Sequence, residues 1–294
     1  MPMRFTIAAL LLGSAAFPAA AQDAQSLIAK NLQARGGAAA ISAIKSIRFK
    51  GRSIAPGDFE LTYEETRERV GPSAAAARVD LTVQGLDLVQ AYDGRGDGWR
   101  INPFQGRKDP ERMSSDEARS MADGALIEGP LLASRTDGSR VEYLGREDFE
   151  GTNAYKLRVT QKDGDQFTYW LDPDTYLEIK VDETRKLRGA EVTNETELGD
   201  YEKVAGVYFP MSVENWAQGQ DKQRQRTIIA SGEANVDVPD GYFSEPGGAS
   251  APAKAAGAAP PDASNKPHSK GGTGTKPGSA KRPATGPSRP AKGE

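Results

Sequence analysis

The sequence predicts a mainly β fold of the α+β kind: a single, strongly curved antiparallel sheet of about eleven strands that forms an incomplete β-barrel, with short helices as a lid over its concave face. Two observations predict this fold. Apolar and polar residues alternate with a period of two through most of the chain, as in strands that are buried on one side. Helical signals occur in only a few short segments. An apolar sheet face is unstable in water, so with few helices to cover it the sheet must curl around them.

Five runs show the alternation most clearly. Their inward positions are Ile47, Phe49 and Gly51 in the first run, Phe59, Leu61 and Tyr63 in the second, Val79, Leu81 and Val83 in the third, Tyr155, Leu157 and Val159 in the fourth, and Leu177, Ile179 and Val181 in the fifth. Gly, Asp and Asn residues separate the later runs, at positions 151–153, 163–165 and 172–174. These residue types favour the tight turns of antiparallel hairpins.

Helical signals mark two regions. Asp23 can cap a helix whose apolar face holds Leu27, Ile28 and Leu32 and which ends at Gly36 and Gly37, and residues 38–44 add a short second turn. The spacing of Ser114 and Glu117 matches a capping box, which predicts a central helix running to about Ala122.

The N-terminus has the pattern of a secretory signal peptide, which we assign to residues 1–21. Arg4 is followed by an apolar core from Phe5 to Phe17, and Ala19 to Ala21 forms a small-residue cleavage site. About 13 apolar residues are too few to span a bilayer, which needs roughly 20. We therefore expect a periplasmic protein, cleaved near Ala21, whose folded domain covers residues 22–245.

Residues 246–294 differ in composition from the rest of the chain. They consist almost entirely of Ala, Pro, Gly, Ser and basic residues, which predicts a disordered tail. Eight basic and two acidic residues give this tail a net charge of +6, so the whole-chain charge of −3 leaves −10 for residues 22–245 once Arg4 is set aside. The tail could touch anionic lipid or cell-wall polymer, or serve only to solubilise the domain. An exported protein with an acidic domain is not expected to bind nucleic acid.

Catalytic and metal-binding residue patterns are absent from the sequence of the domain. The chain has no cysteine, and its one histidine, His268, lies in the predicted tail. A Ser-His-Asp triad and a Cys or His metal site are thereby excluded from the domain. Neighbouring carboxylates such as Glu64 and Glu65 point to opposite faces of a strand, which does not suit hydrolysis by a carboxylate pair. We predict a binding protein without catalytic residues, metal or cofactor.

The ligand would lie on the concave face of the sheet, between the strands and the lid. The candidate cavity residues are Phe59, Leu61, Tyr63, Leu81, Val83, Trp99, Ile101, Phe104, Tyr169, Leu171 and Ile179. The segment from Trp99 to Phe104 fits a cavity mouth or a partner-facing edge, and equally a strand that packs its aromatic residue into the core. Trp170 has the opposite parity to Tyr169, so one of the two must face away from the core.

Several segments in this order resemble the outer-membrane lipoprotein-sorting proteins of the LolA-like superfamily. They are ARGGAAAISAIKSI at 34–47, YDGRGDGWRINPFQG at 92–106, the central helix with GPLL, the stretch from VEYLGREDF to TYLEIK, DYEKVAGVYFPMSVENW at 200–216 and VDVPDGYFSEP at 236–246. The resemblance implies an open β-barrel with a helical lid and an apolar cavity for acyl chains. Carriers of this superfamily gate the lid with an arginine; the early strands hold Arg48, Arg52, Arg67, Arg69 and Arg78, and the sequence does not single one out.

The leading hypothesis is a monomeric periplasmic carrier of lipid or acylated lipoprotein, with a membrane-associated acceptor protein as a candidate partner. The basic tail departs from the carriers, so a second hypothesis keeps the fold but makes the protein a sensor that binds a protein partner. A third hypothesis, a carboxylate-based hydrolase, predicts polar rather than apolar residues in the cavity.

Overall fold

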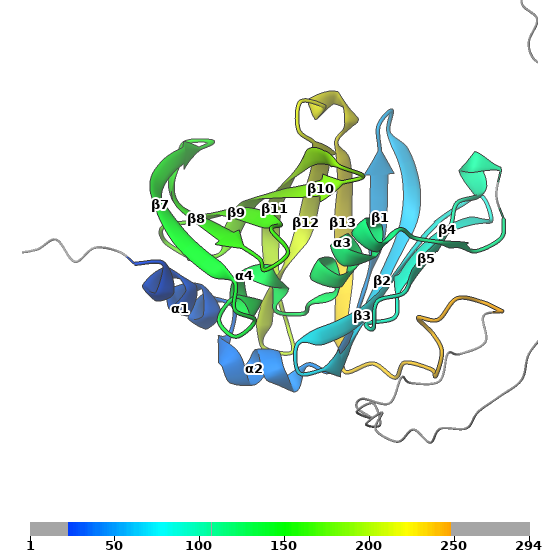
Figure 1. Cartoon of the computed structure of the whole chain (residues 1–294), viewed down its shortest axis with the longest axis horizontal. Coiled ribbons are helices and arrows are strands. Elements are labelled where there is room, and N and C mark those ends of the chain that lie inside the picture. The colour runs from blue at the N-terminus through cyan, green and yellow to red at the C-terminus, as the bar shows by residue number, and fades with distance from the viewer. Residues whose placement is uncertain (1–22, 107, 248–294) are drawn as a thin grey trace, which may run out of the picture. The chain divides into compact units, whose positions relative to one another are not determined.

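The computed structural model describes residues 23–106 and 108–247. The predicted signal peptide and all but the first two residues of the predicted tail lie outside these ranges. The described chain forms one antiparallel sheet of 13 strands in the order β6-β5-β4-β3-β2-β1-β13-β12-β11-β10-β9-β8-β7, so β6 and β7 are its two edges (Figure 1). The sheet is curved and is not closed into a barrel, which confirms the predicted fold class.

The strands are β1 (Ser46–Ala55), β2 (Phe59–Gly71), β3 (Ala74–Val83), β4 (Leu86–Tyr92), β5 (Gly98–Ile101), β6 (Glu111–Arg112), β7 (Arg140–Phe149), β8 (Thr152–Thr160), β9 (Gln166–Leu171), β10 (Glu178–Leu187), β11 (Ala190–Val204), β12 (Val207–Ala217) and β13 (Gln225–Ala234). The sequence predicts about eleven strands. A strand of two residues such as β6 is too short to show a period of two, which is one reason for the lower number.

The helices form at the predicted sites. In α1 (Ala24–Ala34), the Asp23 side chain accepts a hydrogen bond from the Ser26 N–H at 2.6 Å. The second helix, α2 (Gly37–Ala43), follows at once, and α3 (Ser115–Ala125) begins with the predicted capping box and runs three residues past Ala122. The five-residue helix α4 (Gly129–Ala133) was not expected, because Gly129 and Pro130 suggest an interruption; proline is tolerated in the first turn, where its missing N–H costs no hydrogen bond.

A close contact fixes the corner between α1 and α2. Gly36 has a φ of +124°, and a Cβ on this residue would lie 2.4 Å from the carbonyl oxygen of Gly206 in the β11–β12 hairpin. Only glycine fits there. The Tyr208 N–H donates to the Arg35 carbonyl at 2.9 Å, which joins the end of α1 to the start of β12.

The helices α3 and α4 lie over the concave face of the sheet, while α1 and α2 lie at its lower border (Figure 1). Around α1, α2 and α4 the concave face is filled by a core of fully buried side chains. Among its members, those with essentially no exposed surface are Leu27, Ile28, Ile44, Ile47, Ile127, Leu131, Leu157, Leu171, Val159 and Val207. This part of the concavity is therefore packed solid.

Residues 236–247 cross the opposite, convex face of β1 to β5. The Ser46 hydroxyl donates to the Val236 carbonyl at 2.6 Å, and the Arg78 guanidinium donates to the Tyr242 carbonyl at 3.3 Å. The Trp99 indole N–H donates to the Phe243 carbonyl at 2.8 Å, and Trp99 is 2% exposed. We call this segment the C-terminal strap. It covers the apolar cluster of Val89, Ala91 and Trp99 on the outside of the sheet.

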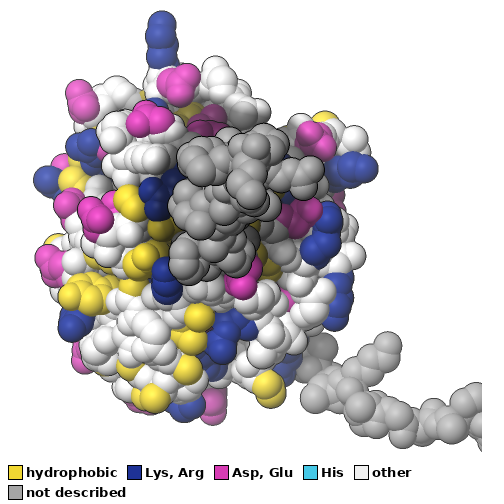
Figure 2. Space-filling model, turned by 90° about the vertical axis from the view of Figure 1, so that its left-hand side faces the viewer, with side chains coloured by type: hydrophobic (Ala, Val, Ile, Leu, Met, Phe, Trp, Pro, Cys, Tyr) yellow, Lys and Arg dark blue, Asp and Glu magenta, His cyan; other side chains and the backbone are white. Residues whose placement is uncertain are grey.

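The edge strand β7 carries features that oppose pairing with a further strand. A register shift between Tyr143 and Gly145 interrupts its ladder with β8. The side chains of Arg140, Arg146 and Glu147 are exposed along it. On the side of the molecule that carries α1 and β7, basic and acidic side chains are interspersed with apolar ones (Figure 2). Bulges and charges of this kind protect sheet edges from association.

Candidate ligand cavity

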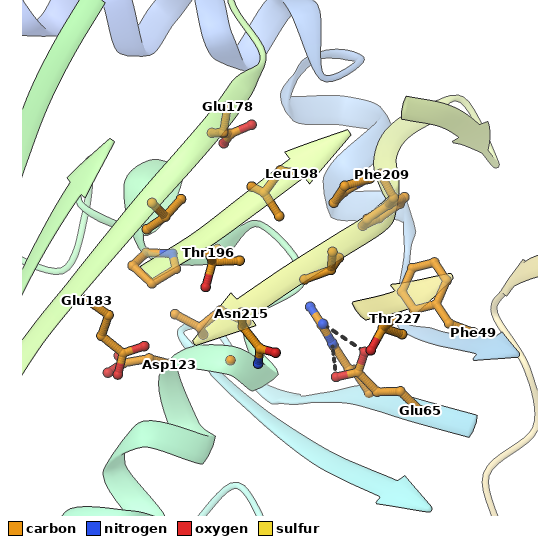
Figure 3. A pocket seen from close by; sticks show the side chains of 18 of the residues that line it. Phe49, Glu65, Asp123, Glu178, Glu183, Thr196, Leu198, Phe209, Asn215 and Thr227 are labelled. Carbon is orange, nitrogen blue, oxygen red and sulfur yellow. Dashed lines mark hydrogen bonds and ion pairs between the residues drawn. The ribbon is translucent and has the colours of Figure 1, made fainter. Parts of the chain in front are cut away.

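A cavity of about 620 Å³ lies between the concave face of the sheet and the α3–α4 segment (Figure 3). Its walls come from β1 to β4 on one flank, β9 to β13 on the other, and residues 120–131 above. Pockets that hold small-molecule ligands typically measure about 300–1,000 Å³. The concave face is thus filled at the α1 end and hollow beside α3.

Apolar side chains form much of the cavity wall, because the inward parity of each strand points into it. They are Phe49, Tyr63, Val79, Leu81, Leu126, Ile127, Leu131, Phe167, Tyr169, Val181, Leu198, Phe209, Val213 and Ile229. The rings of Phe49 and Phe209 meet edge to face with their centroids 5.3 Å apart. This set supplies the apolar surface that the sequence predicts.

The same wall also holds charged groups, which the prediction of an apolar cavity did not include. On β2, the Arg67 guanidinium donates to both carboxylate oxygens of Glu65, at 2.8 and 2.9 Å. The Tyr63 hydroxyl donates to Glu65 at 2.8 Å. Burial, together with the Glu65 charge, raises the pKa of Tyr63 well above its usual value. Burial lowers the pKa of Arg67, but the Glu65 charge and hydrogen bonds outweigh burial, so the pKa of Arg67 is raised.

A second pair lies where the cavity meets the packed core. Arg35 donates to the carbonyls of Tyr208, Glu128 and Ile127 at 3.2, 3.1 and 3.4 Å, and its guanidinium lies 3.6 Å from the Glu178 carboxylate. The Tyr201 hydroxyl donates to the Glu178 carbonyl at 2.8 Å. Burial raises the pKa of Tyr201, and the Glu178 charge adds to the shift.

A third group of charges lies where α3 meets β10. Arg185 is 2% exposed, and it binds Asp165 at 3.1 Å and Asp123 at 3.3 Å, and also Glu183. Asp123 further accepts from the Gln161 amide at 2.7 Å, and Glu183 accepts from the Ser120 hydroxyl at 3.3 Å. Burial raises the pKa values of Asp123 and Glu183, although Arg185 acts in the opposite direction.

Ion pairs from both halves of the sheet hold the α3–α4 segment over the cavity. On the β2 side, Arg69 binds Glu128 at 2.7 Å and donates to the Ile44 carbonyl at 3.0 Å. On the β5 side, Arg100 binds Glu117 at 2.9 Å. The Ser114 N–H and Arg100 together lower the pKa of Glu117 to about 2. Arg185 anchors the same segment to β10.

Only some of the predicted cavity residues line the cavity. Tyr63, Leu81 and Tyr169 line the cavity, and Leu171 is fully buried in the core beside it. The wall does not include Leu61, Val83 or Ile179. Whether the three lining residues contact a ligand stays a prediction.

The segment from Trp99 to Phe104 lies away from the cavity. Trp99 and Ile101 pack with Val89 on the convex face, beneath the C-terminal strap and apart from the core on the concave face. Phe59 and Phe104 are 44% and 48% exposed, and their ring centroids lie 6.5 Å apart.

Trp170 is covered although it faces away from the core. Its ring lies beneath the ammonium groups of Lys156 and Lys180, at 4.5 and 4.9 Å, and its N–H donates to Glu147 at 3.1 Å.

Glu65 and Arg67 are lining residues that the sequence analysis missed. They share the parity of Tyr63 on β2, so the alternation itself places them on the same face. Asp123 and Glu183 were missed because their approach depends on how α3 packs against β10, and Glu178 because its partner Arg35 comes from the end of α1. Among the described residues, no group of three or more acidic or histidine side chains could hold a metal ion. No helix in residues 23–106 and 108–247 is long and apolar enough to cross a membrane.

Comparison with known proteins supports the fold. The chain matches no protein-family model and no curated protein sequence. It is similar to the solved structure of a domain from Vibrio parahaemolyticus named as an outer membrane lipoprotein-sorting protein, with a TM-score of 0.53 and 13% identity over 75% of this chain and 97% of that one. A DUF1329 family protein from Desulfovibrio piger gives a TM-score of 0.54 and 12% identity over 75% of this chain and 96% of that one.

A LolA superfamily protein from Nitrosomonas europaea gives 16% identity over 76% of this chain and 97% of that one, with a TM-score of 0.49. The match to the Vibrio parahaemolyticus domain confirms, at the level of the fold, the resemblance predicted from the sequence.

Proposed function

We propose that this protein is a periplasmic carrier that binds the acyl chain of a lipid or an acylated protein in the cavity between the sheet and α3–α4. The observation that carries the proposal is the cavity of about 620 Å³, whose wall combines apolar side chains from the strands with the charged groups described above. A fold shared with a domain named for lipoprotein sorting supports it. The residues expected to contact the chain include Tyr63, Leu81 and Tyr169 from the sequence prediction, and Phe49, Val213 and Ile229 from the cavity wall.

Burial of methylene groups would supply the binding free energy. Each buried methylene contributes about 0.8 kcal/mol, so a twelve-carbon chain gains roughly 9 kcal/mol. Association costs about 4 kcal/mol or more in lost translational and rotational freedom. The net affinity of a short chain is therefore modest, and a polar anchor for its head group would improve it.

Native mass spectrometry of protein purified from the periplasm without detergent tests this function. We expect phospholipid or acylated peptide to co-purify at about one molecule per chain, since one cavity of this size suits one ligand. The ligand should be recovered intact; a cleaved product would support the hydrolase hypothesis instead. A mass that stays at the apoprotein value, even after incubation with lipids and lipopeptides, would refute the carrier.

A matched pair of variants locates the ligand. Leu81→Trp adds a large side chain to the cavity wall and should abolish co-purification of the ligand. Leu144→Trp places the same side chain at the edge strand β7, where Leu144 is 39% exposed, and should leave co-purification unchanged. Equal ligand content in both variants would place the ligand outside the cavity.

A further inference from the structure

The charges around the cavity are unbalanced. Four carboxylates, those of Glu65, Asp123, Glu178 and Glu183, line it together with the guanidinium groups of Arg35 and Arg67, which leaves a formal charge of −2. Arg185 and Arg119 lie behind the wall, where Asp165 contacts both and Arg119 also contacts Asp116 and Asp163, so these groups add no net positive charge to the balance.

Both guanidinium groups already lie beside a carboxylate of the wall. Arg67 is bound by both oxygens of Glu65. Arg35 is bound by three backbone carbonyls and lies beside Glu178. A carboxylate or phosphate ligand at either guanidinium would lie close to the carboxylate already bound there, and the two negative charges would repel each other.

The carboxylates of Asp123 and Glu183, by contrast, share one cation. Arg185 is divided among Asp123, Asp165 and Glu183. Oε1 of Glu183 accepts from Ser120 and contacts Arg185, while its Oε2 accepts no hydrogen bond from any residue that the structure describes. A carboxylate has about four acceptor sites, so this pair can take further donors. We call Asp123 and Glu183 the acidic pair.

The negative charge of the acidic pair affects the pKa of Tyr169, which also lines the cavity. Burial raises the pKa of Tyr169 well above its usual value, and the charges of Glu178, Asp123 and Glu183 add to the shift. A negative potential of this kind, at a site partly shielded from solvent, favours a positive charge on a ligand.

The acidic pair lies on the opposite side of the cavity from the rings of Phe49 and Phe209. Figure 3 shows Asp123 and Glu183 close together on one side, and Phe49 and Phe209 on the other. A ligand that spans the cavity would therefore place its polar end at α3 and β10, and its apolar end against β1 and β12.

From this geometry we infer that the cavity selects amphiphiles with a cationic head, an alkyl ammonium group bound by Asp123 and Glu183, with the hydrocarbon chain against Phe49 and Phe209. The inference rests on the proposed function and names the class of ligand. Ammonium groups supply up to three N–H donors, which match the open acceptor sites of the acidic pair.

Three probes of equal chain length test the inference by isothermal titration calorimetry: dodecylamine, dodecanol and dodecanoate, each below its aggregation limit at about pH 7.5, where the amine and the acid are charged. We expect dodecylamine to bind at least about tenfold more tightly than dodecanoate, with dodecanol in between. Glu183→Gln should bring the amine to within about twofold of dodecanol and leave dodecanol itself unchanged. Glu197→Gln, which removes a carboxylate bound to Arg224 but not part of the cavity wall, should leave all three affinities unchanged.

The outcomes separate the two proposals. If dodecanol and dodecylamine bind but dodecanoate binds as tightly as the amine, the charge selection is refuted and the carrier stands. If none of the three binds, and no lipid co-purifies, the carrier itself is refuted. If Glu183→Gln keeps the preference for the amine while its thermal unfolding matches the parent protein, the acidic pair is not the recognition site.

Discussion

Replacement of Arg185 by methionine should destabilise the protein by an amount that depends on pH. Arg185 is 2% exposed and contacts the carboxylates of Asp123, Asp165 and Glu183. Methionine fills a similar volume without a charge. The variant would therefore leave three carboxylates, one of them 5% exposed, without their shared cation.

The expected loss is about 3–5 kcal/mol at neutral pH, which is typical when one partner of a buried ion pair is removed. Burial raises the pKa values of all three carboxyl groups in the folded protein. A raised pKa means that the folded state binds more protons than the unfolded state, so protonation favours folding as the pH falls. Without Arg185 these pKa values rise further, and the stability deficit should be complete above them and shrink as the pH falls through them.

Urea unfolding of the parent and the variant at about pH 7.5 and pH 5 measures this deficit, since burial raises the folded-state pKa values and the loss of Arg185 raises them further. Arg188→Met is the matched control. Arg188 is at the β10–β11 turn, its side chain is 77% exposed, and its contact with Glu117 is 3.6 Å long. An exposed pair of this kind contributes about 0–1 kcal/mol. A deficit for Arg185→Met that is no larger than for Arg188→Met, or that is equal at both pH values, would refute the reasoning.

Three further predictions concern the cavity and the strap. Trp99→Phe removes the donor to the Phe243 carbonyl and should lower the free energy of unfolding, measured in urea, by about 1–3 kcal/mol. The affinity for dodecylamine should not change, because Trp99 is on the convex face. An altered affinity would mean that the strap and the cavity are coupled. Arg69→Met removes the ion pair with Glu128 and should speed amide hydrogen exchange in residues 126–133, while exchange in the strap stays constant. Equal acceleration in both segments would instead indicate that the whole domain is destabilised. The affinity for dodecylamine should fall as the pH is lowered through the raised pKa values of Asp123 and Glu183, because protonated carboxyl groups carry no charge. Titration calorimetry at several pH values measures this affinity. An affinity that does not change with pH would contradict the prediction.

Local patterns predicted most of the secondary structure. The caps at Asp23 and Ser114 fixed the starts of α1 and α3, since each side chain satisfies N–H groups within its own helix. The alternation identified the long strands because each buries one face along its length. The packing of α3 could not be predicted in this way, because it depends on contacts such as Arg185 with Asp123, which are 62 residues apart.

The position of Trp99 shows a different limit. The alternation shows which residues of β5 share a face with Trp99. It does not show whether that face is concave or convex, because this depends on which segments cover each face. The cover is the C-terminal strap, whose anchors Tyr242 and Phe243 stand alone in a segment without periodicity. A local pattern therefore could not assign Trp99 to the outside of the sheet.

The charged residues explain why the concavity is only partly filled. At the α1 end, side chains such as Leu27 and Ile28 pack to exclude water, because apolar side chains gain from close contact. Beside α3, inward positions of β2 and β10 hold Glu65, Arg67 and Glu183, which must keep their hydrogen-bond partners and cannot collapse onto one another without loss. Apolar residues of similar volume at these positions could be as stable or more so, but they would close the hollow. The inward charges thus favour an open space over a denser core, which is the arrangement that a binding cavity requires.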